Sequence, residues 1–315
     1  GGAETVSASD TDDGGDSAGR PTSAPLLVVG TAESKGQRPY MEDRVVYVGD
    51  AGALPGNDGR LAGVPLFGVL DGHGGVRCVE FATRRIPEAL AADGAYDVEA
   101  SDGAAATALT RAFTRADVEF LAQAAPGRWG DGTTATCCAL RGATLDVANV
   151  GDSRAVLGRV DEKTGRVVAT NLSHDHKPDS ERERKRIEGG GGYVAPSRMP
   201  GVGFVGPARV WDRTRMFGLA TSRSMGDTVY VGPNRSGVIA EPEVTSHRLD
   251  ANDRYVIFGT DGVWDHVTSQ EAVEIARRHP NPQKASEAIA QCARERWRRN
   301  GPMQDDITAV VVGLA

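Results

Sequence analysis

Residues 66–75 read Leu-Phe-Gly-Val-Leu-Asp-Gly-His-Gly-Gly, a short apolar run that ends in an acidic, glycine-rich turn. A second run of this kind, Tyr255 to Thr260, leads into Asp261-Gly262. Short apolar runs bounded by turn residues predict buried β-strands. Asp-Gly occurs seven times in the chain, but only at these two places does it end a strongly apolar run. Asp71 and Asp261 are therefore predicted to lie at the ends of two core strands.

The remainder of the chain predicts an α+β fold in which strands outnumber helices. Further strands are expected at residues 26–29, 45–48, 134–140, 145–150, 155–160, 167–170 and 307–312. Amphipathic helices are expected at about residues 76–90, 104–124, 179–188, 269–279 and 283–299. These helices come in consecutive pairs between groups of strands, so regular β-α-β winding fits poorly. Two antiparallel sheets packed together, with the helices outside, satisfy the pattern.

The domain organisation follows from local composition. Residues 1–24 contain five acids, one base and almost no large apolar side chains, so we expect a disordered acidic leader. Residues 25–315 show no linker and no internal repeat, and we expect them to form one domain. Within it, residues 189–213 combine glycines and prolines without a sustained period, which predicts a long irregular flap. Such a segment either contacts substrate or is an insertion without consequence.

Charge and cysteine content argue against several classes of protein. The 315-residue chain has a formal net charge of −7 at pH 7 and no basic stripe with interleaved aromatics, so we expect no nucleic-acid binding. Its four cysteines form no Cys-x-x-Cys pair, which favours a reducing compartment, the cytoplasm or the nucleus, over a disulfide framework or a zinc site. No apolar run reaches the ~18 residues of a membrane span. We expect a monomer.

Two further acidic pairs, Glu42-Asp43 and Asp305-Asp306, directly precede apolar strands. In an antiparallel sheet the start of one strand lies beside the end of its neighbour, so acids at strand starts and strand ends can gather at one edge. The aspartates expected to meet there are Asp43, Asp71, Asp261 and Asp305. Four carboxylates repel each other unless cations compensate them, and oxygen ligands suit Mg²⁺ or Mn²⁺. Two such ions would make a water reactive toward phosphorus. The alternative is that these acids are solvated turn residues.

Two basic residues accompany the acids. His73 follows Asp71 in a glycine-rich turn at the start of a predicted helix, where backbone can approach a ligand and an imidazole can donate a proton to a leaving group. Arg38 lies five residues before Asp43, and its guanidinium fork matches two phosphate oxygens. Either residue alone is typical of an ordinary turn or surface, so their significance depends on the neighbouring acids.

Eight segments carry a resemblance that extends from about residue 32 to residue 312. They are 38–43 (RPYMED), 67–75 (FGVLDGHGG), 132–135 (GTTA), 148–155 (ANVGDSRA), 175–179 (DHKPD), 218–227 (GLATSRSMGD), 260–265 (TDGVWD) and 305–308 (DDIT). In this order they resemble the metal-dependent protein serine/threonine phosphatases of type 2C. The resemblance implies a four-layer α-β-β-α sandwich, two antiparallel sheets flanked by helix pairs, with a two-metal site at one end. It also implies hydrolysis of phosphoserine and phosphothreonine on phosphorylated proteins by a two-metal-activated water, without a phosphoenzyme intermediate.

The resemblance also implies a role for each site residue. The residues expected to hold the two ions, Mg²⁺ or Mn²⁺, are Asp43, Asp71, Asp261 and Asp305, with Gly72 through its backbone carbonyl and Glu42 through water. Arg38 is expected to clamp the phosphate, and His73 to act as general acid. Asp152 and Asp265 match positions that hold an additional, weaker metal in some family members, and a structural role is their alternative. His174 and His176 have the spacing of a metal pair but are expected to be structural.

This sequence departs from the family pattern at three places, of which one, Thr133 in place of a common Ser, is a mild change. Asp306 stands where the family usually has Asn, and its added negative charge beside a ligand is expected to change metal affinity or its pH dependence. Residues 199–215 are longer than in minimal members and resemble the flap of plant or protist relatives. A catalytically silent phosphoprotein-binding scaffold is the main alternative function, although such a protein is expected to lose ligands and every ligand position here is filled. A two-metal nuclease would need a basic groove.

Overall fold

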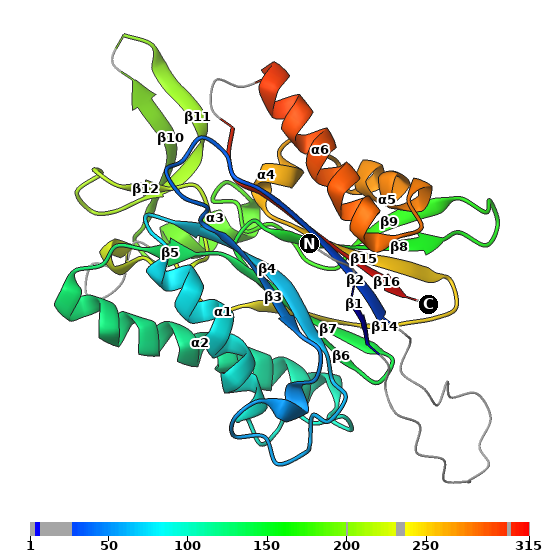
Figure 1. Ribbon diagram of the computed structural model, residues 1–315. Coiled ribbons are helices and arrows are strands. Elements are labelled where there is room, and N and C mark those ends of the chain that lie inside the picture. Colours follow the sequence, from blue (N-terminus) through cyan, green and yellow to red (C-terminus); the bar gives the residue numbers. More distant parts are fainter. Residues whose placement is uncertain (1–3, 7–26, 200, 231–236, 301–303, 315) are drawn as a thin grey trace, which may run out of the picture.

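The computed structural model describes residues 4–6, 27–199, 201–230, 237–300 and 304–314. Two antiparallel sheets lie face to face, and a pair of helices covers the outer face of each sheet (Figure 1). This arrangement confirms the four-layer α-β-β-α sandwich that the sequence predicts.

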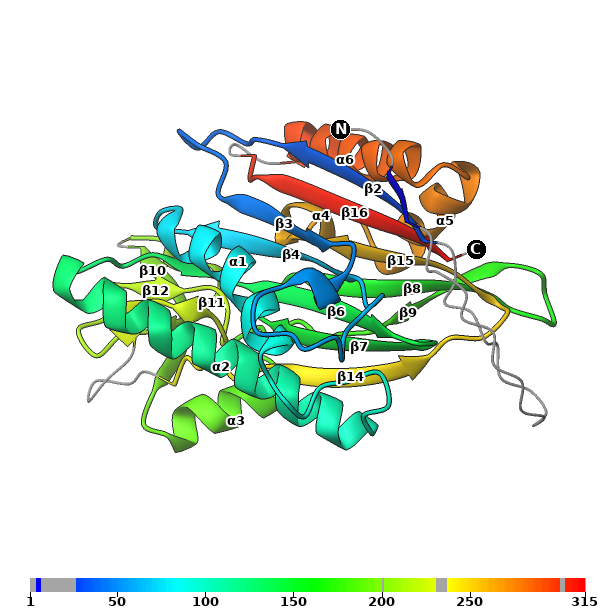
Figure 2. The ribbon, with the colours of Figure 1, turned by 60° about the horizontal axis from the view of Figure 1, so that its bottom comes forward.

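The first sheet contains six strands in the order β1-β2-β16-β15-β8-β9 (Figure 2). Their bounds are β1 Glu4–Val6, β2 Leu27–Ser34, β16 Ile307–Leu314, β15 Asp253–Gly259, β8 Arg154–Val160 and β9 Val167–Asn171. Helices α5 (Ser269–Arg278) and α6 (Pro282–Asn300) cover its outer face. Helix α5 begins at a capping box in which the Thr268 hydroxyl accepts a hydrogen bond from the Glu271 backbone N–H.

The second sheet has the order β13-β5-β4-β6-β7-β14, and β3 pairs with β4 beside this path. Its strands are β13 Met225–Gly226, β5 Gly132–Thr133, β4 Leu66–His73, β6 Ala135–Arg141, β7 Thr144–Val150, β14 Glu243–Arg248 and β3 Asp43–Val48. Helices α1 (Arg77–Ala91) and α2 (Asp102–Gly127) cover its outer face. The short elements η1 (Ala51–Ala53), η2 (Thr228–Tyr230) and α4 (Asp261–Trp264) lie in connections.

Strand β4 shows why the sheets stack between helices. Leu66 and Leu70 belong to the core cluster under α1 and α2, whereas Phe67 and Val69 belong to the cluster between the two sheets. The Phe67 ring packs edge-on against Phe258 of β15, with the ring centroids 5.7 Å apart. Side chains alternate between the faces of a strand, so a strand buried on both faces reads as the continuous apolar run seen in the sequence.

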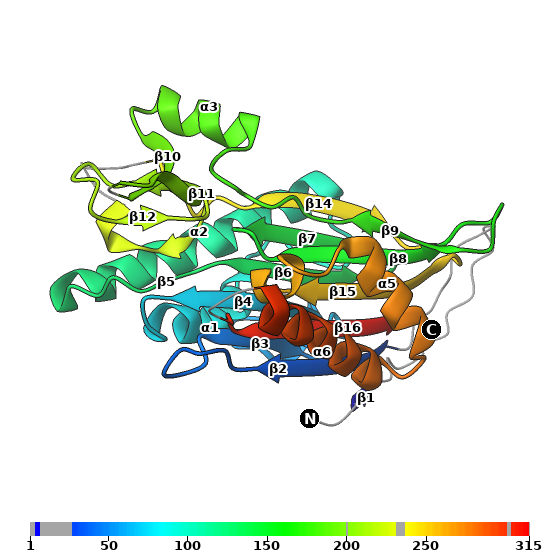
Figure 3. The same ribbon diagram turned by 90° about the horizontal axis from the view of Figure 1, so that it is seen from above.

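One end of the sandwich carries a separate small layer, seen from above in Figure 3. It consists of helix α3 (Glu181–Gly189) and the strands β10 (Tyr193–Met199), β11 (Gly203–Trp211) and β12 (Gly218–Leu219). The sequence predicts an irregular flap at residues 189–213, and the structure corrects this, because β10 and β11 form an antiparallel hairpin. The hairpin register shifts between Pro196 and Ser197, and this break conceals the two-residue period in the sequence. We call residues 193–199 and 201–219 the flap.

Two other segments differ from what the sequence predicts. Strand β14 is not predicted from the sequence, because it lies at a sheet edge and its residues EVTSHR are largely polar. Within the predicted leader, Glu4–Val6 pairs with β2 as strand β1, and the other leader residues lie outside the described ranges. No helix in the described ranges has the length and apolar character that crossing a membrane requires.

Candidate active site

The four predicted acidic positions converge at the end of the sandwich nearest the flap. Asp43 at the start of β3 is the register partner of Asp71 near the end of β4. The Asp43 carboxylate accepts a 2.9 Å hydrogen bond from the hydroxyl of Thr260, the residue that follows β15 in the opposite sheet and precedes Asp261. Asp71, Asp261 and Asp305 line one cleft of about 460 Å³. The antiparallel strand-end argument is therefore correct in placing these acids together.

Burial and mutual repulsion make the ionised form of these acids costly. Burial raises the pKa of Asp43 to about 8, and the charges of Asp306 and Asp261 add to the effect. Burial also raises the pKa of Asp71 and of Asp261 well above the usual value. The charges of Asp43 and Asp305 further raise the pKa of Asp71, and the charge of Asp71 further raises the pKa of Asp261. A carboxyl group held in such surroundings is stabilised in its charged form by a cation.

The residues present fit a hard divalent cation. The Oδ1 atom of Asp43 is buried and has no hydrogen-bond partner in the described structure. The donor set consists of oxygens alone, which Mg²⁺ and Mn²⁺ prefer. Among the residues that the structure describes, no group of three His, Cys, Asp and Glu side chains has the geometry of a preformed metal cage. The fit to a divalent cation therefore rests on the unpartnered Oδ1 of Asp43, on the negative charge of the clustered carboxylates and on their oxygen donors.

Glu42 and Gly72 lie at the rim of this acidic group. One Glu42 carboxylate oxygen accepts from the Gly75 N–H at 2.9 Å, and the other accepts from Arg38 at 2.6 Å. The Gly72 N–H donates to the Glu42 carbonyl at 3.2 Å, which holds the β4 end against the strand start. Both Glu42 oxygens are thus engaged by the protein itself.

Arg38 is oriented by two carboxylates and lines the cleft. Its Nη1 donates to Glu42, and its Nη2 lies 3.1 Å from Asp305 Oδ1. Burial alone would lower the pKa of the Arg38 guanidinium, but the charges of Asp305 and Glu42 raise it above its usual value. The guanidinium therefore remains a fixed cation beside the acids, where a phosphate oxygen can reach it.

Asp227 is a functional residue that sequence reasoning missed. His73 Nε2 lies 2.9 Å from Asp227 Oδ2 and 3.0 Å from Oδ1. Burial alone would lower the pKa of His73, but the charge of Asp227 and its hydrogen bond raise it. Asp227 is itself held by the Ser224 hydroxyl, and it has the left-handed φ of +52°. The segment GLATSRSMGD contains Asp227, but nothing in the sequence indicates which residue it contacts.

Gly132 explains how close the His73–Asp227 pair can lie to strand β5. A Cβ at Gly132 would clash with both the Asp227 carboxylate and His73 Nε2. Glycine at this position therefore leaves the space in which the two side chains meet.

Asp152 and Asp265 are placed differently from each other. Asp152 lines the cleft, and its carboxylate lies 2.6 Å from Lys177 Nζ. Asp265 follows α4 and is exposed. Lys177 thus already balances the charge of Asp152, so an additional cation there would compete with an ammonium group.

The Asp306 carboxylate accepts hydrogen bonds from two backbone N–H groups. Its Oδ1 accepts from the Gly36 N–H and its Oδ2 from the Glu42 N–H, both at 2.7 Å. The carboxylate therefore fixes both ends of the segment that carries Arg38. An asparagine side chain has only one oxygen for these two donors.

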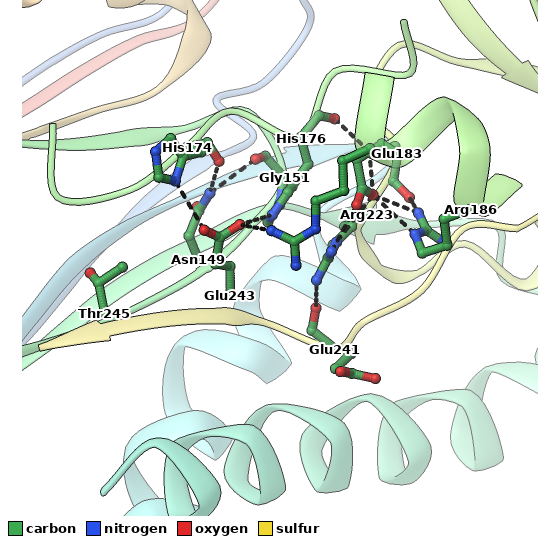
Figure 4. A network of polar contacts seen from close by, with 12 residues as sticks. Asn149, Gly151, His174, His176, Glu183, Arg186, Arg223, Glu241, Glu243 and Thr245 are labelled. Atoms are coloured by element: carbon green, nitrogen blue, oxygen red, sulfur yellow. Dashed lines mark hydrogen bonds and ion pairs between the residues drawn. The ribbon is translucent and has the colours of Figure 1, made fainter. Parts of the chain in front are cut away.

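A buried polar network supports the segment that carries Asp227 (Figure 4). Glu183 of α3 accepts from Arg223 at 2.7 Å, from Arg186 at 2.6 Å and from the Ser222 hydroxyl at 2.9 Å. Burial alone would raise the pKa of Glu183, but the two arginines hold it below its usual value. The network thus fastens α3 to the residues directly before Ser224 and Asp227.

His174 and His176 belong to the same region and not to the cleft (Figure 4). His174 Nδ1 lies 2.9 Å from Glu243, and His176 Nδ1 accepts from the Gly151 N–H at 3.0 Å. Burial lowers the pKa of His176, which favours the neutral ring that such an acceptor needs. Their contacts agree with the structural role expected from the sequence.

Comparison with known proteins gives consistent results. The family described as "Protein phosphatase 2C" matches residues 28–300. "Probable protein phosphatase 2C 22" of Arabidopsis thaliana is 36% identical over 288 residues, which cover 89% of this chain and 66% of that protein. "Probable protein phosphatase 2C 59" of the same plant is 34% identical, with 96% of this chain and 84% of that protein covered. The Bos taurus "Integrin-linked kinase-associated serine/threonine phosphatase 2C" is 33% identical, with 90% and 75% covered.

Solved structures share the fold. The serine-threonine phosphatase 2C from Toxoplasma gondii superposes with a TM-score of 0.78 at 24% identity and covers 94% of this chain and 97% of its own. A C. elegans sex determining protein superposes with a TM-score of 0.71 at 23% identity, with 91% and 64% covered. A family match over most of the chain, with relatives above 30% identity, shows that this chain belongs to the protein phosphatase 2C family of protein phosphatases.

Proposed function

We propose that the protein hydrolyses phosphoserine and phosphothreonine on phosphorylated proteins, with a water activated by two divalent cations and without a phosphoenzyme intermediate. The observation that carries the proposal is the shared cleft, in which the acids Asp71 and Asp261, whose pKa values are raised, lie beside Arg38 and His73. This combination supplies a place for cations, a clamp for phosphate and a donor for the leaving group.

The residues that would hold Mg²⁺ or Mn²⁺ are Asp43, Asp71, Asp261 and Asp305, with the Gly72 carbonyl and with Glu42 through water. When bound, two such ions lower the pKa of water to near neutrality and offset the charge of the phosphoryl oxygens. A weaker third ion at Asp152 and Asp265 would have to displace Lys177, whose pKa is raised by the charge of Asp152 although burial opposes this.

Arg38 and His73 perform the remaining chemistry. Arg38 donates N–H groups to the phosphate oxygens, and its ion pairs with Glu42 and Asp305 hold it in place before substrate arrives. His73 uses Nε2 to contact Asp227, so Nδ1 is the ring atom from which a proton can pass to the serine or threonine oxygen that leaves.

The cysteines support water as the nucleophile. None of the four cysteines is among the residues that line this cleft. Burial raises the pKa of Cys137 to about 12 and raises the pKa of Cys78 and Cys138 well above the usual value. The thiolate required for a covalent cysteine intermediate is therefore disfavoured at all three positions.

One assay tests the proposed function against its alternatives. In Mn²⁺, the protein is expected to hydrolyse a phosphothreonine peptide faster than a phosphotyrosine peptide and to leave single-stranded and duplex DNA intact. A protein that binds the phosphothreonine peptide without turnover would be a scaffold, and one that cleaves DNA would be a nuclease.

A further inference from the structure

The cleft continues outward onto an exposed apolar surface. Phe217, Val229 and Pro207 line the same cleft as Asp71 and Asp261. Phe217 is 53% exposed, and the neighbouring Met216 is 74% exposed. A polypeptide that places a phosphoryl group at the acidic end of the cleft therefore also meets large apolar side chains at the other end.

The flap also concentrates positive charge beside this surface. It carries four arginines, Arg198, Arg209, Arg213 and Arg215, against a single acid, Asp212, whereas the whole chain has a net charge of −7. None of the four pairs with a carboxylate in the described structure, while arginines elsewhere near the site, such as Arg38 and Arg223, are bound to acids. Arg209 donates to the Gly218 carbonyl at 2.7 Å and lines the cleft.

Asp212, the single acid of the flap, is hydrogen-bonded to backbone N–H groups. The Asp212 carboxylate accepts from the N–H groups of Thr214 at 3.0 Å and of Met216 and Phe217 at 2.9 Å. Asp212 is buried and forms no ion pair with an arginine of the flap among the described residues. Its hydrogen bonds build the turn that presents Arg213, Arg215 and the two apolar side chains to solvent.

We propose that this surface, the flap arginines together with Met216 and Phe217, binds an acidic segment of the phosphoprotein substrate beside the phosphorylated residue. The proposal rests on the proposed function, since the cleft supplies continuity between the phosphate position and the flap. Unpaired guanidinium groups attract carboxylates and orient them through paired N–H donors. The adjacent exposed phenylalanine and methionine favour a peptide, whose side chains they can cover, over a uniformly charged nucleic-acid backbone.

The test compares two phosphothreonine peptides of the same sequence, one with glutamates on both sides of the phosphothreonine and one with glutamines. For the wild type in Mn²⁺ at low salt, kcat/KM is expected to be about tenfold higher for the acidic peptide, as several exposed ion pairs together can supply. The ratio is expected to approach one at about 1 M salt, where the screening length is about 3 Å.

Substitutions test whether the preference for the acidic peptide comes from the flap. In the double variant Arg213→Gln/Arg215→Gln, the ratio is expected to fall to about one at low salt. The matched control is Arg248→Gln, an exposed arginine at the far end of β14 that also pairs with no carboxylate among the described residues, and it should keep the tenfold ratio. Phe217→Ser is expected to raise KM for both peptides about fivefold, with the ratio unchanged.

Three results would overturn the proposal. They are equal kcat/KM values for the two peptides with the wild type, a ratio that survives in the double variant, or an equal loss in Arg248→Gln. Turnover of both peptides at equal rates would leave the proposed function standing. If the wild type hydrolyses neither peptide in Mn²⁺, the proposed function fails and this inference fails with it.

Discussion

The imidazole of His73 and the carboxylate of Asp227 lie 2.9 Å apart, although 154 residues separate them in the chain. The Asp227 carboxylate is buried, and it lines the cleft beside His73. In the proposed mechanism, Asp227 therefore positions the proton donor His73.

Asp227→Asn is expected to slow turnover of a phosphothreonine peptide about 10²-fold, within the range that general acid catalysis contributes. Hydrolysis of p-nitrophenyl phosphate should fall much less, because its leaving group needs no proton. Rates with both substrates check this, and Asp161→Asn at the exposed β8–β9 turn is the control. An equal loss with the two substrates would mean that Asp227 acts only on folding or metal binding.

Gly132→Ala is expected to reduce kcat for phosphothreonine peptides by at least tenfold, because the new methyl group must displace His73 or Asp227. Gly103→Ala in α2 is the control, since a Cβ there meets open space and should leave stability unchanged or raise it by up to ~1 kcal/mol. Steady-state kinetics and urea unfolding separate the two effects. Wild-type kcat in a folded Gly132→Ala protein would contradict the geometry.

Glu183→Gln tests the network behind Asp227. Breaking a buried ion pair on one side typically costs about 3–5 kcal/mol of unfolding free energy. Because the folded-state pKa of Glu183 is lowered, its contribution is present above the unfolded pKa of about 4.3 and is lost as pH falls through the folded value. The stability difference from wild type is therefore expected to be large at pH 7 and smaller below pH 4.

Chemical denaturation at both pH values measures this difference. Glu181→Gln is the matched control, because Glu181 lies on the same helix and pairs with Lys185 in full solvent contact. Its effect should stay within about 0.5 kcal/mol. A Glu183→Gln protein as stable as the control at pH 7 would show that the network does not stabilise the fold.

Asp306→Asn is expected to lower the free energy of unfolding by about 1–3 kcal/mol, because one of two backbone N–H groups loses its acceptor. The loosened segment carries Arg38, so KM for phosphopeptides should rise. Urea unfolding in the absence of added metal checks the stability, and a Mn²⁺ titration checks the predicted change in metal affinity. Unchanged stability would argue that asparagine satisfies both donors.

Much of the fold can be predicted from the local pattern of apolar and polar residues in the sequence. The central residues of strands β4 and β15 are buried on both faces, so these stretches are apolar. Asp71 near the end of β4 and Asp261 after β15 mark where the apolar stretches stop. The edge strand β14 and the hairpin of the flap lack that signal, because one is half exposed and the other contains a register shift at Pro196.

The candidate site, like the fold, is only partly predictable from the sequence. The convergence of Asp43 and Asp71 follows from antiparallel pairing, which sequence order can suggest. The contacts of Asp227 with His73 and of Lys177 with Asp152 depend on how loops cross the end of the sandwich. No period or motif encodes those crossings, so these partners become visible only in three dimensions.

The most direct measurement is a Mn²⁺ titration of phosphothreonine-peptide hydrolysis by the wild type and by Asp71→Asn, with a phosphotyrosine peptide as the control substrate. The wild type is expected to show no turnover without the metal and saturable turnover with it. Asp71→Asn should lose more than the ~10–100-fold typical of residues that only support a metal ligand. Metal-dependent turnover that is the same in both proteins would contradict the assignment of this acidic cleft as the metal site.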